Sequence, residues 1–287
     1  MKWSALILIW AQILFVSNLA VAATSENSSA DEPVKAEIIL DAYPHAFDSS
    51  TASPPMTTDD PGTAEVNKPE FTFVMANCDR SASGRSCEGD VTMATGLTKN
   101  IEISIKKSAV RENMNGEPAF HGVGATELET VINFYDKNGL SMAVAPNYTM
   151  NDATRKKDSE GHEVTSDGRI VYIPLLISKK IGNNTVVANV GYKAALDDPS
   201  NNSITTNLAV GHAISDRSIL MGEITSERNT NFSNRRTDVR IGYARVIFPD
   251  NKDYQVSIGT SVGHSLGHTD DGNSHTTVLF YLQIVKK

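Results

Sequence analysis

Charged residues stand at every second position in several strand-like stretches of this sequence. Arg236, Asp238 and Arg240 alternate with Val239 and Ile241, for example. Successive side chains of a β-strand point to opposite faces, so the three charges share one face and the apolar residues share the other. Such a charged face would be hard to bury in a soluble core but suits a polar, enclosed interior. By this register, the inward-facing charged residues are Lys106, Glu127, Glu129, Lys193, Glu223, Arg236, Asp238 and Arg240.

These inward charges have two interpretations, and the sequence leaves both open. In the first, they line a pore and bias its selectivity, as rings of charge do in channels. In the second, opposite charges pair across a narrow interior and fill it. Glu223 stands alone in an otherwise apolar run, so a buried position would require a partner for it. Arg236 and Arg240 are the nearest cations along the chain.

The two cysteines, Cys78 and Cys87, flank a stretch rich in Ser, Gly and Arg. In an exported chain, an oxidising compartment favours their pairing as a disulfide. Their spacing is not that of a C-x-x-C motif, and no histidine lies nearby to complete a metal site. We therefore expect a disulfide that closes the first long connection between strands.

Three histidines, His264, His268 and His275, fall near two aspartates in the last connection. Imidazole and carboxylate groups together can ligate a divalent metal. The mixed spacing specifies no coordination geometry, and a solvated loop has the same composition. We predict no metal site and no cofactor, and we keep these histidines as weak candidates.

Enzymatic activity is not predicted. Some outer-membrane barrels are hydrolases, and a serine and a histidine two residues apart on a strand would share one outer face. The sequence contains no His-x-Ser pair. His212 and Ser215 are three residues apart, so on a strand their side chains would point to opposite faces. It also contains no G-x-S-x-G nucleophile elbow.

The elements that must position these residues are about twelve strand-like runs between Glu70 and Val285 with period-two alternation. The short connections are expected at 98–100, 136–139, 182–184, 213–216 and 248–252. The long connections are expected at 77–89, 109–121, 151–167, 196–202, 228–234 and 264–273. Long and short connections alternate throughout, as in transmembrane barrels with short periplasmic turns and longer outer loops. The pattern therefore predicts a closed, antiparallel all-β barrel whose two ends lie on the short-turn side.

Three regions follow from the N-terminal sequence. Residues 1–22 resemble a secretory signal peptide, with Lys2, an apolar run and an Ala-Val-Ala cleavage site. Residues 23–69 are rich in Ser, Thr, Asp, Ala and Pro, and predict a flexible segment in the periplasm or entering the lumen. Residues 70–287 form the barrel. Removing Lys2 leaves 25 basic against 34 acidic residues, a net charge of −9 that argues against nucleic-acid binding.

A resemblance to a known family appears in an ordered set of short motifs. The stretches are 57–63 (TTDDPGT), 96–102 (GLTKNIE), 122–124 (GVG), 173–175 (IPL) with Ser178 and Lys179, 189–192 (NVGY), and 222–223 (GE). Together they resemble the MetA-like transporter family of bacterial outer-membrane barrels associated with phenol-degradation pathways. The resemblance covers roughly residues 55–285. It implies an outer-membrane location and passage of small compounds, with apolar or aromatic compounds among the candidates.

Two features depart from the usual pattern of outer-membrane barrels. The chain ends in Ile284-Val285-Lys286-Lys287 and not in an aromatic residue, and no tryptophan follows the predicted signal peptide. Interfacial aromatic girdles would therefore depend on phenylalanines and tyrosines. The tyrosines are Tyr43, Tyr135, Tyr148, Tyr172, Tyr192, Tyr243, Tyr254 and Tyr281.

Three functional hypotheses follow. The first is a Gram-negative outer-membrane channel for a small molecule, in contact with outer-membrane lipid and inserted by the outer-membrane assembly machinery. The second is a non-transporting structural or interaction barrel with a filled lumen. The third is a secreted soluble β-sandwich, in which alternating faces meet a core and water.

Overall fold

The structure, a computed structural model, describes residues 58–154, 156–157, 163–164, 168–231, 235–248, 251, 253–266 and 274–286. The chain divides into two compact units, Met1–Pro44 and His45–Lys287, and all described residues belong to the second. The predicted signal peptide and residues 23–57 lie outside the described residues. No helix in the described part of the chain is long and apolar enough to span a bilayer.

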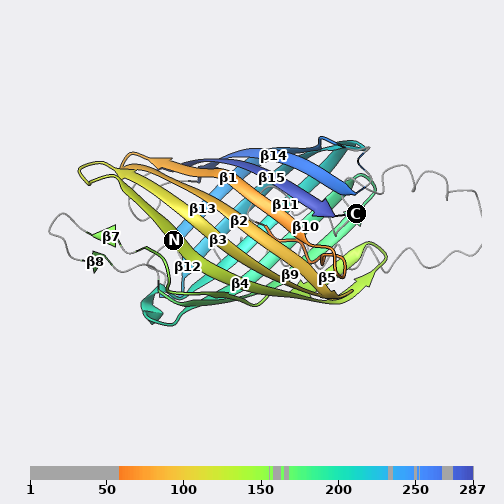
Figure 1. Cartoon of the computed structure of the whole chain (residues 1–287), viewed down its shortest axis with the longest axis horizontal. Coiled ribbons are helices and arrows are strands. Elements are labelled where there is room, and N and C mark those ends of the chain that lie inside the picture. Colours follow the sequence, from red (N-terminus) through yellow and green to blue (C-terminus); the bar gives the residue numbers. More distant parts are fainter. Residues whose placement is uncertain are drawn as a thin grey trace, which may run out of the picture. The chain divides into compact units, whose positions relative to one another are not determined.

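The second unit is a closed antiparallel barrel (Figure 1). Each strand pairs with its neighbours in sequence, and the last strand pairs with the first. The first strands are β1 Glu70–Ser81, β2 Gly84–Thr98, β3 Ile101–Met114, β4 Phe120–Lys137, β5 Leu140–Val144 and β6 Asn147–Thr149. The later strands are β9 Ile170–Ile181, β10 Asn184–Ala195, β11 Ser203–Ser215, β12 Ser218–Asn229, β13 Arg235–Val246, β14 Tyr254–Ser265 and β15 Thr276–Lys286.

Strands β5 and β6 occupy one position in the barrel wall. Both pair with β4 on one side and with β9 on the other, and Ala145-Pro146 separates them. Proline lacks the N–H that a ladder hydrogen bond requires, so the strand is interrupted there. Counting the two as one gives the predicted twelve strands, and the closed ring excludes the β-sandwich alternative.

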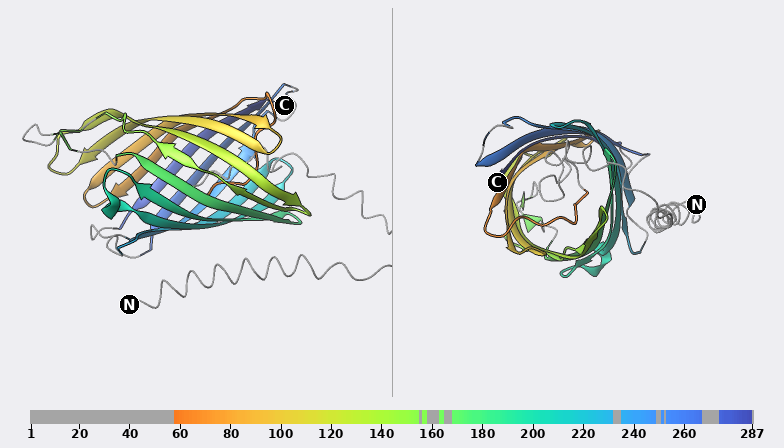
Figure 2. Two further views of the ribbon diagram at one scale, coloured as in Figure 1. Left: turned by 90° about the horizontal axis from the view of Figure 1, so that it is seen from below. Right: turned by 90° about the vertical axis from the view of Figure 1, so that its right-hand side faces the viewer.

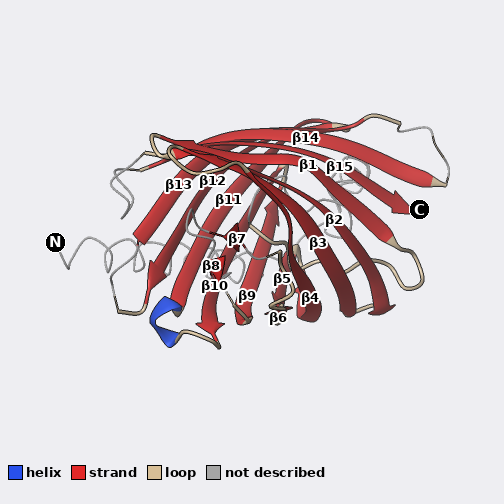
Figure 3. Cartoon of the chain, turned by 60° about the vertical axis from the view of Figure 1, so that its left-hand side comes forward, coloured by secondary structure: helices blue, strands red, loops and turns tan. Residues whose placement is uncertain are grey.

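The remaining elements lie in the long connections. A 3₁₀ turn, η2 Pro199–Asn201, joins β10 to β11 and is the helical piece in Figure 3. A small hairpin of β7 Lys156–Lys157 and β8 Glu163–Val164 lies between β6 and β9. The long-connection end of the barrel therefore carries the extra structure, as the alternation of connection lengths predicts.

The first two long connections differ from their prediction. Strands β1 and β2 continue to Ser81 and Gly84, so a two-residue turn joins them where residues 77–89 were expected to form a loop. Strands β3 and β4 likewise leave only residues 115–119 between them. Register irregularities interrupt β1 after Val74 and β3 after Lys107. A bulge shifts the side-chain parity, so the sequence alternation breaks while the strand itself continues.

The two faces of the wall follow the predicted alternation. On β14, Ser257 and Ser261 are 9 % and 4 % exposed, whereas Ile258 and Val262 are 44 % and 49 % exposed. Small polar residues therefore face the interior, and apolar residues form the outer surface. Further outward apolar residues on other strands are Ile103, Ile105, Leu128, Phe134, Ile173, Val190, Ile204, Leu220, Ile241 and Phe280. A continuous apolar outer surface of this kind suits contact with lipid.

The interior holds the chain that precedes β1. Residues 58–66, called here the inner segment, lie inside the ring of strands, as the end-on view in Figure 2 shows. Thr58 and Pro61 are almost completely buried, and Ala64 is 2 % exposed. Asn133 donates a hydrogen bond from Nδ2 to the Pro61 carbonyl at 2.9 Å. Of the segment predicted to be flexible, the described part therefore packs in the lumen.

The inner segment enters at the short-connection end. Val66 forms a parallel bridge with Gly96, and Thr63 Oγ1 donates to the Lys99 carbonyl at 3.0 Å. The Ala64 amide donates to Glu102 Oε2 at 2.5 Å. A Cβ at Gly96 would lie 2.2 Å from the Ala64 carbonyl oxygen. Glycine at this position therefore allows the segment to lie directly against β2.

Candidate functional site

The barrel encloses a cavity of about 990 Å³ beside the inner segment. Side chains from both halves of the barrel line it, together with Asp59 of the inner segment. The opening is lined by charged, hydroxyl and apolar groups that meet at one aqueous space. This cavity is the candidate site, and its two walls differ in chemistry.

The wall formed by β1–β4 is acidic. Its inward carboxylates alternate with small or apolar residues along each strand, because every second side chain points into the lumen. We call this set the acidic wall; it consists of Glu70, Glu88, Asp90, Glu102, Glu127 and Glu129. Lys106, the basic residue that lines the cavity on the same strands, forms an ion pair with Glu127 at 2.8 Å. The six carboxyl groups of this wall thus share the one lysine that lines the cavity on the same strands, and Lys106 also attracts Asp90 and Glu88.

The wall formed by β12–β15 contains apolar residues. Ile219, Met221, Ala244 and Tyr281 form a buried cluster, which we call the apolar wall, and Val74 packs against it. Of these four residues, Tyr281 lines the cavity and the other three lie behind the lining. The Tyr281 ring packs against Gly259, where an added Cβ would lie 1.9 Å from a ring carbon. Tyr281 and Tyr172 were expected at the membrane interfaces, and this prediction is wrong for both, because they line the cavity. The odd parity of Tyr281 relative to Phe280 was the signal that could have placed it inside.

The predicted inward charges separate into several groups. Five of them line the cavity: Lys106, Glu127, Glu129, Lys193 and Arg240. Lys193 pairs with Glu227 at 2.9 Å, and Ser203 donates to the other Glu227 oxygen at 2.7 Å. Arg236, Asp238 and Glu223 instead contact the wall or the inner segment. The structure therefore places the eight side chains inside, but it does not bring them together at one point.

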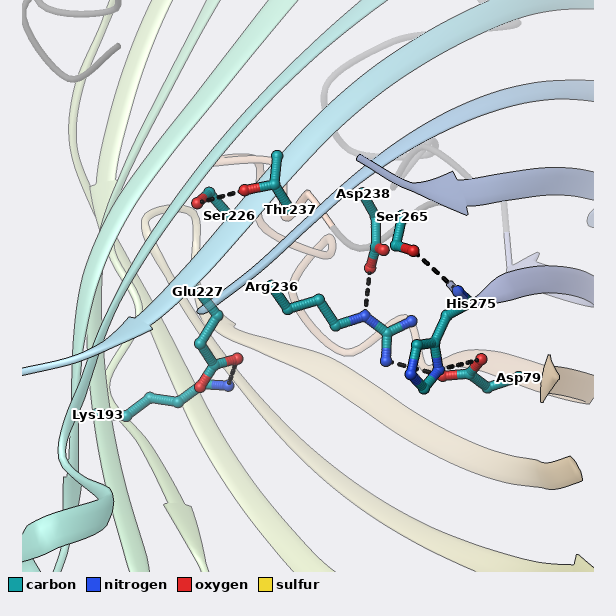
Figure 4. Close-up of polar contacts among 9 residues, drawn as sticks. All are labelled: Asp79, Lys193, Ser226, Glu227, Arg236, Thr237, Asp238, Ser265 and His275. Atoms are coloured by element: carbon teal, nitrogen blue, oxygen red, sulfur yellow. Dashed lines mark hydrogen bonds and ion pairs between the residues drawn. The ribbon is translucent and has the colours of Figure 1, made fainter. Parts of the chain in front are cut away.

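Arg236 forms a network near the long-connection end (Figure 4). Its Nη1 lies 2.7 Å from Asp79 Oδ2, and its Nε lies 2.8 Å from Asp238 Oδ2. His275 Nδ1 lies 3.0 Å from the second oxygen of Asp79. Arg236 is thus held by two carboxylates on different strands. Asp79 was not among the predicted inward charges, because it fell in an expected loop and the bulge in β1 shifts its side-chain parity.

Glu223 has a different partner from the one expected. Thr58 of the inner segment donates a hydrogen bond from Oγ1 to Glu223 Oε1. Arg240 stands directly opposite Glu223 in the β12–β13 register, and Arg236 is committed to Asp79 and Asp238. The inner segment therefore crosses the lumen from β2 and β3 to β12. Among the described residues, Thr58 and not one of these two arginines bonds to Glu223, because the inner segment reaches that position.

The cysteine prediction is confirmed. Cys78 and Cys87 stand opposite each other on β1 and β2 and form a disulfide. Arg85 Nε donates to Cys87 Sγ at 3.0 Å. The bridge lies within the hairpin that β1 and β2 extend toward the long-connection end. It therefore links two strands, and not the ends of an open loop.

The histidine candidates are dispersed. His264 is exposed and lies 3.1 Å from Thr276 Oγ1, whereas His275 points toward Asp79. His268 lies outside the described residues. Within the part of the chain that the structure describes, no group of three or more His, Cys, Asp or Glu residues could hold a metal ion. His212 is exposed with Nδ1 2.8 Å from Asn184 Oδ1, on the face opposite to Ser215.

The start of the long β6–β9 connection is fastened to the barrel by Asp152. The Thr126 amide donates to Asp152 Oδ1 at 2.7 Å, and Lys107 Nζ lies 2.8 Å from Asp152 Oδ2. These donors stabilise the ionised carboxylate and hold the pKa of Asp152 well below its usual range. The contact therefore persists at all but strongly acidic pH.

Comparisons with known proteins agree with this architecture. No family model and no curated protein sequence matches the chain. The solved COG4313 outer membrane channel from Pseudomonas putida F1 is similar, with 11 % identity, a TM-score of 0.60, and coverage of 80 % of this chain and 99 % of that chain. The NanC porin is similar at 9 % identity and a TM-score of 0.50, over 75 % of this chain and 99 % of that chain. At these identities the likeness shows the fold, which is that of solved outer-membrane barrels.

Proposed function

We propose that this protein is an outer-membrane channel through which small molecules diffuse, narrowed at its short-connection end by the inner segment. The observation that carries the proposal is a cavity of about 990 Å³ with charged lining, enclosed by a barrel whose outer surface is apolar. Water and solutes fit the polar interior, and lipid fits the exterior. The two solved barrels of similar fold support the same assignment.

Membership of the MetA-like transporter family is part of this proposal. Residues 58–63 and 96–102, which belong to two of the motifs that carry the resemblance, contact each other in the described structure. Thr63 bonds to the Lys99 carbonyl, and the inner segment bridges to Gly96. Short motifs far apart in the sequence thus build one structural feature. Cleavage after Ala22, a Gram-negative outer membrane, insertion by the assembly machinery and the absence of catalysis complete the proposal.

A non-transporting barrel with a filled lumen is the second candidate. It is favoured by the inner segment, whose Thr58 bonds across the lumen to Glu223, and by the ion pairs of Arg236 and Lys193. The residual cavity argues for the channel, because these contacts leave a large part of the lumen unoccupied. Direct measurement of permeation separates the two.

The test is reconstitution of the purified full chain in planar bilayers with KCl on both sides. Discrete current steps that scale with the number of inserted barrels are expected of a channel. A correctly folded barrel that gives no current and no solute-induced swelling of liposomes would contradict the proposal and favour the filled barrel. Cell fractionation tests the location, because recovery in the periplasm or medium would contradict an integral outer-membrane protein.

A further inference from the structure

Arg240 is a cavity-lining arginine that forms no ion pair with the residues that the structure describes. It lies in the middle of β13 and lines the cavity. It forms no hydrogen bond or ion pair with any residue in the described ranges, and its Nε and Nη1 atoms are buried. A partly buried cation that lacks a partner is costly, since its lost hydration is not replaced. Arg236, four residues earlier, shows the contrast because it holds two carboxylates.

Gly263 on β14 has no side chain, and this leaves room for the side chain of Arg240 to lie along the wall. A Cβ at Gly263 would lie 2.5 Å from Arg240 Cγ and 2.7 Å from Thr277 Oγ1. The stem of Arg240 therefore crosses β14 toward β15, where the Thr277 hydroxyl lies beside it. Thr277 is 3 % exposed, and its Oγ1 has no partner among the described residues. The guanidinium and this hydroxyl both supply donors, so an oxyanion would satisfy them.

Apolar groups lie next to this arginine along the same wall. Leu279 and Tyr281 follow Thr277 at every second position of β15, so all three face inward. Leu279, Tyr281 and Val74 line the cavity together with Arg240, and Val74 stands opposite Tyr281. Tyr281 is itself part of the apolar wall, in which it packs with Ile219, Met221 and Ala244. A cation therefore borders an aromatic and aliphatic surface of side-chain size.

The charges around Arg240 leave it open to a solute. Glu223, opposite on β12, accepts from Thr58, and Asp238, two residues earlier, pairs with Arg236. The other carboxylates that line the cavity belong to the acidic wall or its neighbours Glu112 and Asp59. Those of them that are ionised repel an anion, which is therefore favoured beside Arg240. The carboxylates therefore oppose the entry of an anionic solute, and they also direct the anionic end of a solute that has entered toward Arg240.

We infer that Arg240, Thr277, Leu279 and Tyr281 form a binding subsite for a small solute that carries a carboxylate on an apolar, ring-sized body. The carboxylate meets the guanidinium, and the body rests on Leu279 and Tyr281. This inference rests on the proposed channel function, since the solute reaches the subsite through the lumen. Benzoate is the simplest probe with both parts. Acetate supplies only the carboxylate, and benzyl alcohol supplies the ring without the charge.

The test measures the single-channel current of the full chain in KCl while each probe is added. Benzoate is expected to interrupt the current at lower concentration than acetate or benzyl alcohol. In Arg240→Gln the blocking concentration of benzoate should rise about tenfold, the loss expected for one charge-assisted pair. Arg245→Gln removes the same charge from the exposed face of the same strand and should leave the blocking concentration unchanged. Thr277→Val should show a smaller rise.

The outcomes separate the subsite from the channel. Absence of current in the unmodified protein overturns the channel proposal and, with it, the subsite. Normal current that benzoate blocks no better than acetate overturns the subsite alone, and so does an equal effect of Arg240→Gln and Arg245→Gln. Heat-modifiable migration on gels, a property of folded barrels, confirms that each variant is folded. If Arg240→Gln lowers the stability of the barrel but does not change the blocking concentration of benzoate, Arg240 has a structural role and does not bind the solute.

Discussion

The acidic wall and the apolar wall are built from the same kind of strand, yet they differ in the side chains that they turn toward the lumen. Strands β1–β4 concentrate carboxylates and also receive the inner segment through Gly96 and Glu102. Strands β12–β15 bury apolar side chains, and their Arg240 has no ion-pair partner among the described residues. The lumen is therefore polarised across its width. A solute inside it meets a transverse field, which orients charged molecules without requiring a closed binding pocket.

The largest effect on this comparison should come from removing what joins the two walls. Replacing residues 58–66 with a Gly/Ser stretch of equal length removes the bond from Thr58 to Glu223 and the contacts to Asn133 and Glu102. The lumen then widens at the short-connection end, so the single-channel conductance should rise severalfold. Bilayer recordings of the variant and the unmodified protein give the ratio.

The length-matched replacement is its own control for tethering, because the chain before β1 remains attached. An unchanged conductance would show that the inner segment does not limit ion flow. A lowered conductance would mean that the substituted stretch fills the lumen more than the native one does. Either result would remove the inner segment from the proposed function.

A smaller effect in the same direction should follow from one methyl group. In Gly96→Ala the new Cβ would lie 2.2 Å from the Ala64 carbonyl oxygen and 2.9 Å from the Glu65 backbone. Backbone atoms cannot rotate away, so residues 64–66 must leave β2. We expect more frequent transitions to a higher-conductance state, with the barrel still folded. Gly222→Ala is the matched control, because nothing lies within 4 Å of its Cβ position; equal behaviour of the two variants would contradict the prediction.

The selectivity of the lumen tests the acidic wall itself. Glu88→Gln combined with Asp90→Asn removes two cavity carboxylates that have no ion pair among the described residues. The reversal potential under a KCl gradient should indicate cation preference in the unmodified protein and a clear decrease of that preference in the double variant. Arg240→Gln should shift it in the opposite direction. Variants that shift it the same way would show that the walls do not act as opposite poles.

Much of this arrangement could be predicted from sequence, since alternation is a local property. The inward Arg236, Asp238 and Arg240, and the outward Val239 and Ile241, follow from period two alone. The partner of Arg236 could not be predicted in the same way. Asp79 lies 157 residues away, beyond a bulge that resets the parity of β1.

The inner segment marks the other limit of local prediction. Its composition, rich in Thr, Asp, Pro and Gly, resembles that of a flexible linker. What holds it is the space that Gly96 leaves on β2 and the amide of Asn133 on β4, both far away in sequence. Burial of Thr58 and Pro61 therefore depends on the closed barrel, and it could not be predicted from the sequence of residues 58–66 alone.

The smallest effect on the lumen should come from the disulfide, although it belongs to the same strands as the acidic wall. Cys78 and Cys87 are nine residues apart and already paired across a hairpin, so the bridge constrains a short loop. In Cys78→Ser/Cys87→Ser, the free energy of unfolding should fall by about 2 kcal/mol, since cross-linking a short loop removes little entropy from the unfolded chain. Urea titration of the folded fraction on gels measures this loss, and proteolysis near Arg80 and Arg85 should become faster.

Conductance and reversal potential should stay at their unmodified values, because the bridge lies beyond the cavity-lining residues of β1 and β2. A changed conductance would mean that the extended hairpin reaches into the permeation path, and the contrast between the two walls would then include the long-connection end.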